Sequence, residues 1–127
     1  TFVDDSKATN VDATRNALKG QKGPLVLWLG GQGKGESFQP IAQHLPPQTT
    51  VIAFGASRSQ IERDLSQRTN LHIFPTLNSA LQAAPGIIQA TPQLTVLFSP
   101  ACASFDEFAN FEERGRQFQK LIRQNFT

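Results

Sequence analysis

The strongest constraint on the fold is a set of three short, almost continuously apolar runs. They are PLVLWL at 24–29, TTVIAF at 49–54 and LTVLF at 94–98. Apolar runs of this length, rich in branched and aromatic residues, predict strands that are buried on both faces. Such strands occur in parallel sheets with helices packed on either side, so the runs indicate an α/β protein.

Segments with helical spacing separate the apolar runs. Weaker strand signals lie at 1–6 and 71–76, and helical patterns lie at 11–18, 38–45, 60–68, 78–84 and 106–124. This alternation predicts a three-layer, Rossmann-like α/β domain with a mostly parallel sheet of five to six strands.

Three predicted helix starts carry a capping pattern. Thr9, Ser59 and Ser104 each precede an acidic residue by three positions. In this spacing the hydroxyl and the carboxylate cap the free N–H groups of the first turn. In the last helix, a stripe that includes Phe111 and Gly115 is typical of a core-facing side.

Composition narrows the class of protein. The 127 residues suffice for one domain, and 12 basic against 10 acidic residues, scattered along the chain, do not favour nucleic-acid binding. A single cysteine, Cys102, excludes an internal disulfide and fits a reducing compartment. With no long apolar stretch and no signal sequence, we expect a cytoplasmic domain, cut from a longer protein because the chain opens without methionine.

Three loops with unusual chemistry follow predicted strands. They are DDSKATN at 4–10, GGQGKGES at 30–37 and SPACAS at 99–104. Because ligands of open parallel sheets bind beyond the carboxyl ends of the strands, we expect the three loops to meet at one edge.

The glycine-rich loop has two readings. Its backbone and Lys34 suit an anion, but Trp28 and Gly35 stand where a Walker A loop needs glycine and Ser or Thr. The second reading is a plain strand-to-helix connection with a solvated lysine.

The other two loops are equally open when taken alone. In one interpretation, Thr9 or Asn10 is a helix N-cap and Asp5 and Lys7 are ordinary exposed charges; in the other, Asp5 accepts hydrogen bonds from a ligand hydroxyl while Lys7 and Thr9 donate to an anion. Ser104 is either a helix cap or an anion ligand, and Phe111 is a core candidate.

Neither histidine suggests catalysis or metal binding. His44 and His72 are far from Cys102 in sequence and carry no recognisable partner motif. A catalytic cysteine and a metal site are therefore not favoured.

Together, DDSKATN, LGGQGKGESF and LFSPACASFDEFANFEERG, in this order and at these separations, resemble the C-terminal domain of the Mur ligases, in particular those that add D-glutamate. The resemblance spans nearly the whole chain. It implies the third domain of a three-domain cytoplasmic ligase of peptidoglycan synthesis, whose N-terminal and central domains, outside 1–127, hold the UDP-sugar and ATP with Mg²⁺.

The resemblance also implies roles for individual residues. D-Glutamate would be bound by Lys34, Thr9, Ser104 and the backbone N–H of Phe111, while Asp5 would reach the ATP ribose and Lys7 the phosphates. No catalytic or metal-binding residue is expected in this domain, which alone should be inactive. The implied enzyme is a monomer that uses D-glutamate, ATP and, through its other domains, UDP-MurNAc-L-alanine.

Two alternatives remain from the sequence. One is a non-catalytic module of the same fold that binds a small anion. The other is a related glutamate-adding amide ligase similar to folylpolyglutamate synthase, against which the SPACAS segment argues.

Overall fold

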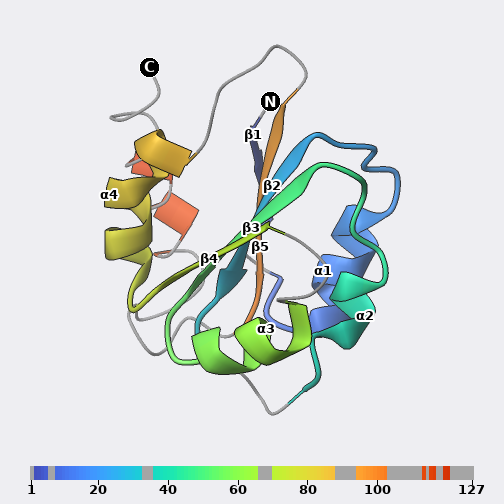
Figure 1. Cartoon of the computed structure of the whole chain (residues 1–127), viewed down its shortest axis with the longest axis horizontal. Coiled ribbons are helices and arrows are strands. Elements are labelled where there is room, and N and C mark those ends of the chain that lie inside the picture. Colours follow the sequence, from blue (N-terminus) through green and yellow to red (C-terminus); the bar gives the residue numbers. More distant parts are fainter. Residues whose placement is uncertain are drawn as a thin grey trace.

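The computed structural model describes residues 2–5, 8–32, 36–65, 70–87 and 94–102, together with 113, 115, 116, 119 and 120. Strands and helices alternate along the chain (Figure 1). They are β1 (Phe2–Asp4), α1 (Val11–Leu18), β2 (Leu25–Gly30), α2 (Gln39–Ala42), β3 (Thr49–Phe54), α3 (Arg58–Leu65), β4 (Asn70–Phe74), α4 (Leu77–Ile87) and β5 (Thr95–Ala101).

The strands form one sheet in the order β1-β5-β2-β3-β4, with every neighbouring pair parallel. The predicted α/β class and parallel sheet are confirmed. Within the described part of the chain the sheet has five strands, and no sixth strand is found there. The last strand in sequence, β5, lies between β1 and β2 and is thus central.

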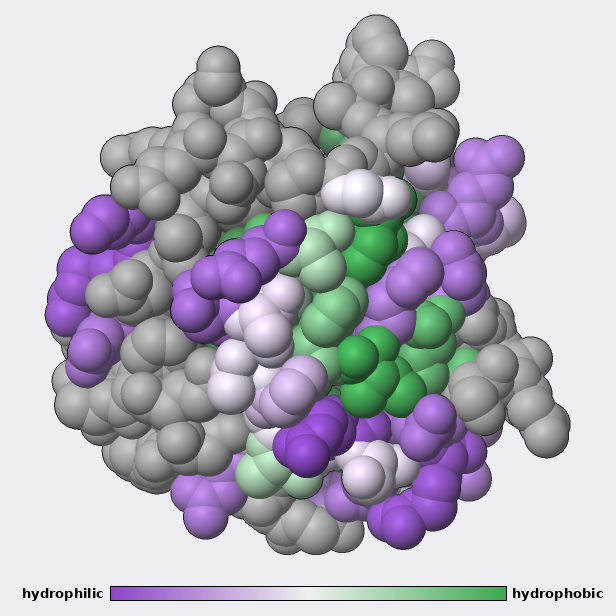
Figure 2. Space-filling view, turned by 60° about the vertical axis from the view of Figure 1, so that its left-hand side comes forward, coloured by the Kyte–Doolittle hydropathy of each residue, from purple (hydrophilic) through white to green (hydrophobic). Residues whose placement is uncertain are grey.

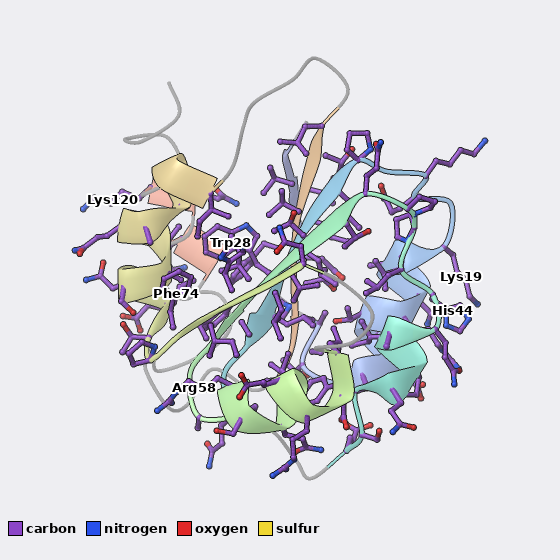
Figure 3. All side chains as sticks on the ribbon, in the orientation of Figure 1. Lys19, Trp28, His44, Arg58, Phe74 and Lys120 are labelled. Atoms are coloured by element: carbon purple, nitrogen blue, oxygen red, sulfur yellow. The ribbon has the colours of Figure 1, made fainter. Side chains whose placement is uncertain are left out.

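Alternate residues of the central strands pack against different helices, which gives the sheet two buried faces. On one face, Leu27 and Leu97 join a core with residues of α1, α2 and α3. On the other face, Trp28 and Phe98 join a core with residues of α4. Trp28 lies between the sheet and α4 in Figure 3. Two separate cores explain why the strand sequences are continuously apolar.

The side of the molecule that carries α4 also brings some hydrophobic residues to the surface. Figure 2 turns this side forward and shows hydrophobic residues in a band between hydrophilic ones. Phe74, Ile87 and Leu94 are only partly buried where they pack against the α4 core. Among the described helices, none is both long and apolar enough to cross a membrane.

The structure decides between the two candidates for the first helix cap and shows that the predicted cap at Ser59 is wrong. The N-cap of α1 is Asn10, not Thr9, because the Asn10 side chain accepts a hydrogen bond from the backbone N–H of Ala13 at 2.9 Å. Helix α3 begins at Arg58, which places Ser59 inside its first turn. The third predicted cap, Ser104, lies outside the described residues.

Strand β5 runs further than the apolar pattern predicts. The run ends at Phe98, but the strand continues through Ser99 and Pro100 to Ala101. Pairing shifts here, because Trp28 opposes Phe98 whereas Gly30 opposes Ala101, so β5 has one extra residue. A bulge of this kind accommodates proline, which cannot donate to the sheet, and ends regular pairing at the carboxyl edge.

Candidate functional site

The carboxyl edge of the sheet carries the described parts of the three segments that the sequence singled out. DDSKATN, GGQGKGES and SPACAS lie at the carboxyl ends of β1, β2 and β5, which are adjacent and parallel, so these strand ends share one edge. Residues 6–7, 33–35 and 103–104 lie outside the described residues, and the meeting of the complete loops stays a prediction. From β2 the chain leads to α2, whereas the described residues between 113 and 120 lie on the α4 side in Figure 1. In open parallel sheets, ligands usually bind beyond the carboxyl ends of the strands, which is the edge where the three segments lie.

The segment after β1 is fixed to β5 by backbone hydrogen bonds. The N–H of Asp5 donates to the carbonyl oxygen of Phe98 at 2.8 Å, and the N–H of Ala101 donates to the carbonyl oxygen of Ala8 at 3.0 Å. Between these bonds, the N–H of Ala8 donates to the carbonyl oxygen of Asp5 at 2.9 Å. The chain around Asp5 is therefore held on both sides by the central strand.

A side-chain network joins the same two elements. Ser99 of β5 and Thr14 of α1 are fully buried, whereas Asp5 is half-buried. The Ser99 hydroxyl donates to a carboxylate oxygen of Asp5 at 2.7 Å and lies 3.0 Å from the Thr14 hydroxyl. The Thr14 hydroxyl in turn donates to the carbonyl oxygen of Ser99 at 2.8 Å. The Asp5 carboxylate is thus held by the Ser99 hydroxyl, which is itself in contact with the Thr14 hydroxyl.

Thr9 lies at the same edge, one residue before Asn10, the N-cap of α1. Its side chain is half-buried, and the helix-capping role that the sequence suggested for it belongs to Asn10. The sequence offered helix capping as the alternative to ligand binding for Thr9. Because Asn10 caps the helix, the ligand-binding role is favoured for the Thr9 hydroxyl.

The base of the glycine-rich loop is held close to β3. Gly30 and Gly31 have positive φ values of 152° and 123°, and a Cβ atom on Gly30 would overlap the carbonyl oxygen of Phe54. The backbone N–H and the hydroxyl of Ser57 both donate to the carbonyl oxygen of Gly31, at 3.0 and 2.8 Å. Only glycine permits this close approach, so the loop begins from a fixed point.

Cys102 follows β5 and is fully buried. Its Sγ lies 3.7 Å from the hydroxyl oxygen of Ser57, a weak contact between the ends of β5 and β3. A thiol without access to solvent is typical of a structural role. Cys102 packs with apolar neighbours in the core beside β5; that it has no catalytic role stays a prediction.

The site residues predicted from the sequence are only partly described. Asp5 and Thr9 are placed at the carboxyl edge, whereas Lys7, Lys34, Ser104 and Phe111 lie outside the described residues. In the described part of the chain, no group of three or more His, Cys, Asp and Glu residues comes together. His44 is exposed, with its Nδ1 2.7 Å from the carbonyl oxygen of Pro40.

Sequence reasoning missed three polar residues at this edge. Ser99, Thr14 and Ser57 are buried hydroxyl residues that support the loops rather than line them. The only available signal was position. Ser99 and Ser57 come after the apolar runs at 94–98 and 49–54, and Thr14 lies on the helix face that also carries Val11 and Leu18. Nothing in the sequence shows that the Ser99 hydroxyl contacts Asp5 and Thr14, or that the Ser57 hydroxyl contacts Gly31.

Comparison with known proteins agrees with this architecture. The model of the family described as "Mur ligase, glutamate ligase domain" matches residues 1–102. The chain is 40% identical over 124 residues to the UDP-N-acetylmuramoylalanine–D-glutamate ligase of Chlorobium chlorochromatii, covering 97% of this chain and 26% of that protein. The proteins of the same name from Thermosynechococcus vestitus and Chlamydia pneumoniae are 40% and 43% identical, over 94% and 97% of this chain.

The chain spans 26–29% of the length of these relatives. The family model covers most of the chain, including β1 to β5 and the carboxyl edge described above. The chain therefore belongs to the Mur ligase family and carries its glutamate ligase domain.

Proposed function

We propose that this chain is the D-glutamate-binding domain of an ATP-dependent ligase that adds D-glutamate to UDP-MurNAc-L-alanine in peptidoglycan synthesis. In the reaction that we propose, the γ-phosphate of ATP is transferred to the alanine carboxylate. The amine of D-glutamate then attacks this acyl phosphate, forms the amide and releases phosphate. The whole enzyme would be a cytoplasmic monomer with separate UDP-sugar, ATP and amino-acid domains.

The observation that carries this proposal is the combination of family and relatives. The chain matches a glutamate ligase domain, and relatives aligned over more than nine-tenths of it are named as D-glutamate ligases. Those names favour D-glutamate addition over a ligase resembling folylpolyglutamate synthase. Since the chain spans about a quarter of these proteins, we propose that residues 1–127 form one domain of a larger enzyme.

The task of such a domain is to hold a small dianion with its amine free to react. We propose that Lys34 pairs with one carboxylate of D-glutamate, that Ser104 and the Phe111 N–H bind the other, and that Thr9 donates its hydroxyl nearby. The location of Thr9 at the carboxyl edge of the sheet, next to Ala8, whose carbonyl oxygen is bonded to β5, supports this assignment. A charge-assisted contact, hydroxyls and backbone donors suit this ligand and fix its orientation.

The nucleotide would approach the same edge from the other domains. A half-buried carboxylate held by Ser99 is suited to accept hydrogen bonds from ribose hydroxyls, so Asp5 fits this part of ATP. We propose that Lys7 lies toward the phosphates, and that Mg²⁺ is bound mainly by residues of the central domain. ATP supplies the phosphoryl group that activates the substrate carboxylate.

Kinetics of the full-length enzyme test the proposal. The wild type is expected to release ADP only when UDP-MurNAc-L-alanine and D-glutamate are both present, and L-glutamate is the control. Lys34→Ala should raise the KM for D-glutamate about ten- to a hundred-fold, because a charge-assisted contact contributes about 1.5–3 kcal/mol. An unchanged KM and kcat for D-glutamate in Lys34→Ala would refute the assignment of Lys34.

A binding module without catalysis would give a different result. It would bind D-glutamate or another small anion but would not link that binding to ADP release in the full-length protein. Calorimetric titration of the full-length protein with D-glutamate, run beside the ADP assay, therefore separates the two functions.

A further inference from the structure

The Asp5, Ser99 and Thr14 network has more contacts than protons. Three oxygen-to-oxygen contacts link the groups, at 2.7, 3.0 and 2.8 Å. Each hydroxyl has one proton, and an ionised carboxylate has none to donate. Only two of the three contacts can hold a proton along their line.

Charge decides where the two protons lie. The Ser99 proton is drawn to the Asp5 carboxylate, which is the strongest acceptor in reach and gives the shortest contact. The Thr14 proton then goes to the carbonyl oxygen of Ser99. Thr14 is left as a neighbour that restricts rotation of Ser99, so the Ser99 hydroxyl is oriented toward Asp5.

This arrangement does more than hold the backbone in place. The N–H and carbonyl of Asp5 are already bonded to Phe98 and Ala8, so the end of β1 is fixed without the side chain. Burying two hydroxyls where apolar groups would pack brings little net stability. The hydroxyls instead fix the orientation of the Asp5 carboxylate. Because Ser99 holds one carboxylate oxygen, the position of the other oxygen is also fixed and it can accept a hydrogen bond from a ligand.

We propose that Ser99 and Thr14 are positioning residues that aim the Asp5 carboxylate at the ribose hydroxyls of the nucleotide. This inference rests on the proposed function, in which Asp5 contacts the ATP ribose. It assigns part of the selection for a ribonucleotide to two residues that do not touch the nucleotide and that belong to β5 and α1.

The test is the preference for ATP over its deoxy analogues. In the full-length ligase, kcat/KM is measured with ATP, 2′-deoxy-ATP and 3′-deoxy-ATP for the wild type, Ser99→Ala and Thr14→Val. Ser99→Ala should reduce the preference for ATP about five- to ten-fold, mainly by raising the KM for ATP at nearly constant kcat. Thr14→Val should act in the same direction, and Thr14→Ser, which keeps the hydroxyl, should keep the preference.

A matched control removes a buried hydroxyl from the opposite edge of the sheet. The Thr49 hydroxyl donates to the carbonyl oxygen of Pro46 at 2.6 Å, at the amino end of β3. Thr49→Val loses a comparable hydrogen bond but should keep the wild-type preference for ATP. If Ser99→Ala does not fold, which a thermal melt shows, the comparison of Thr14→Val with Thr14→Ser carries the test.

Asp5→Asn separates failure of the inference from failure of the proposed function. If Asp5→Asn loses the preference for ATP while Ser99→Ala and Thr14→Val keep it, the positioning role is overturned and the contact of Asp5 with ribose stands. If Asp5→Asn keeps the full wild-type preference for ATP, Asp5 does not recognise the ribose hydroxyls. The proposed contact of Asp5 with ribose and the positioning role of Ser99 and Thr14 are then both overturned.

Discussion

The hydroxyl of Ser57 donates a hydrogen bond to the carbonyl oxygen of Gly31 at 2.8 Å, and its backbone N–H donates to the same oxygen at 3.0 Å. These two hydrogen bonds link the segment after β3 to the start of the glycine-rich loop. Because Gly31 lies three residues before Lys34, the anchor limits where the loop can begin.

Ser57→Ala should therefore affect both stability and substrate use. Removing the buried hydroxyl leaves the backbone bond in place, so the expected loss is about 1 kcal/mol of unfolding free energy. In the full-length enzyme we expect a higher KM for D-glutamate, because Lys34 is less well placed. Chemical denaturation and steady-state kinetics measure the two effects. Ser59→Ala, at an exposed position in α3, which begins directly after Ser57, is the control and should change neither by a measurable amount.

Gly30→Ala should be strongly destabilising. Its φ of 152° and the carbonyl oxygen of Phe54 leave no room for a Cβ atom, so the backbone of β2 or β3 must move. We expect a loss of about 2–4 kcal/mol, measured by thermal unfolding of the isolated domain. Gly86→Ala, in α4 with no atom within 4 Å of the new Cβ, should instead stabilise by about 0.5–1 kcal/mol. Equal effects at the two glycines would contradict the close approach of β2 to Phe54.

Variants of Asn10 and Thr9 should affect different properties: Asn10→Ala the stability of the domain, and Thr9→Val the use of D-glutamate. Asn10→Ala removes the side chain that caps α1, which should cost about 1 kcal/mol of unfolding free energy. Thr9→Val keeps the shape of the side chain, should leave stability nearly unchanged, and should raise the KM for D-glutamate in the full-length enzyme. Melting curves and kinetics of the two variants give the comparison. A Thr9→Val enzyme with normal D-glutamate kinetics would remove Thr9 from the proposed site.

The isolated domain should not ligate. We propose that the phosphate loop and metal ligands belong to another domain, so purified 1–127 should release no ADP from ATP with or without D-glutamate. A coupled ADP assay checks this, with the full-length enzyme as the positive control. Measurable ADP formation by 1–127 would show that the division of tasks between domains is wrong.

Much of the fold could be predicted because its signals are local. The run at 49–54 and the helical pattern at 11–18 coincide with β3 and α1, since burial on two faces and amphipathic spacing are written in neighbouring residues. The ends of elements depend on contacts with other parts of the chain. Strand β5 passes Pro100 because a bulge, set by its pairing with β2, accommodates a residue that normally ends a strand.

The sequence by itself determined the α/β class, the parallel sheet and the family, because alternating apolar runs and three ordered loop motifs are properties of the chain alone. Only the tertiary structure decided that β5 lies between β1 and β2, and that Ser99 thereby meets Asp5 and Thr14, residues 94 and 85 positions away. It also decided which residue caps α1, since Thr9 and Asn10 both carry a side-chain oxygen suited to an N-cap and only the path of the chain selects Asn10. Hydrogen bonds between distant residues depend on strand order and register, and no local pattern encodes either.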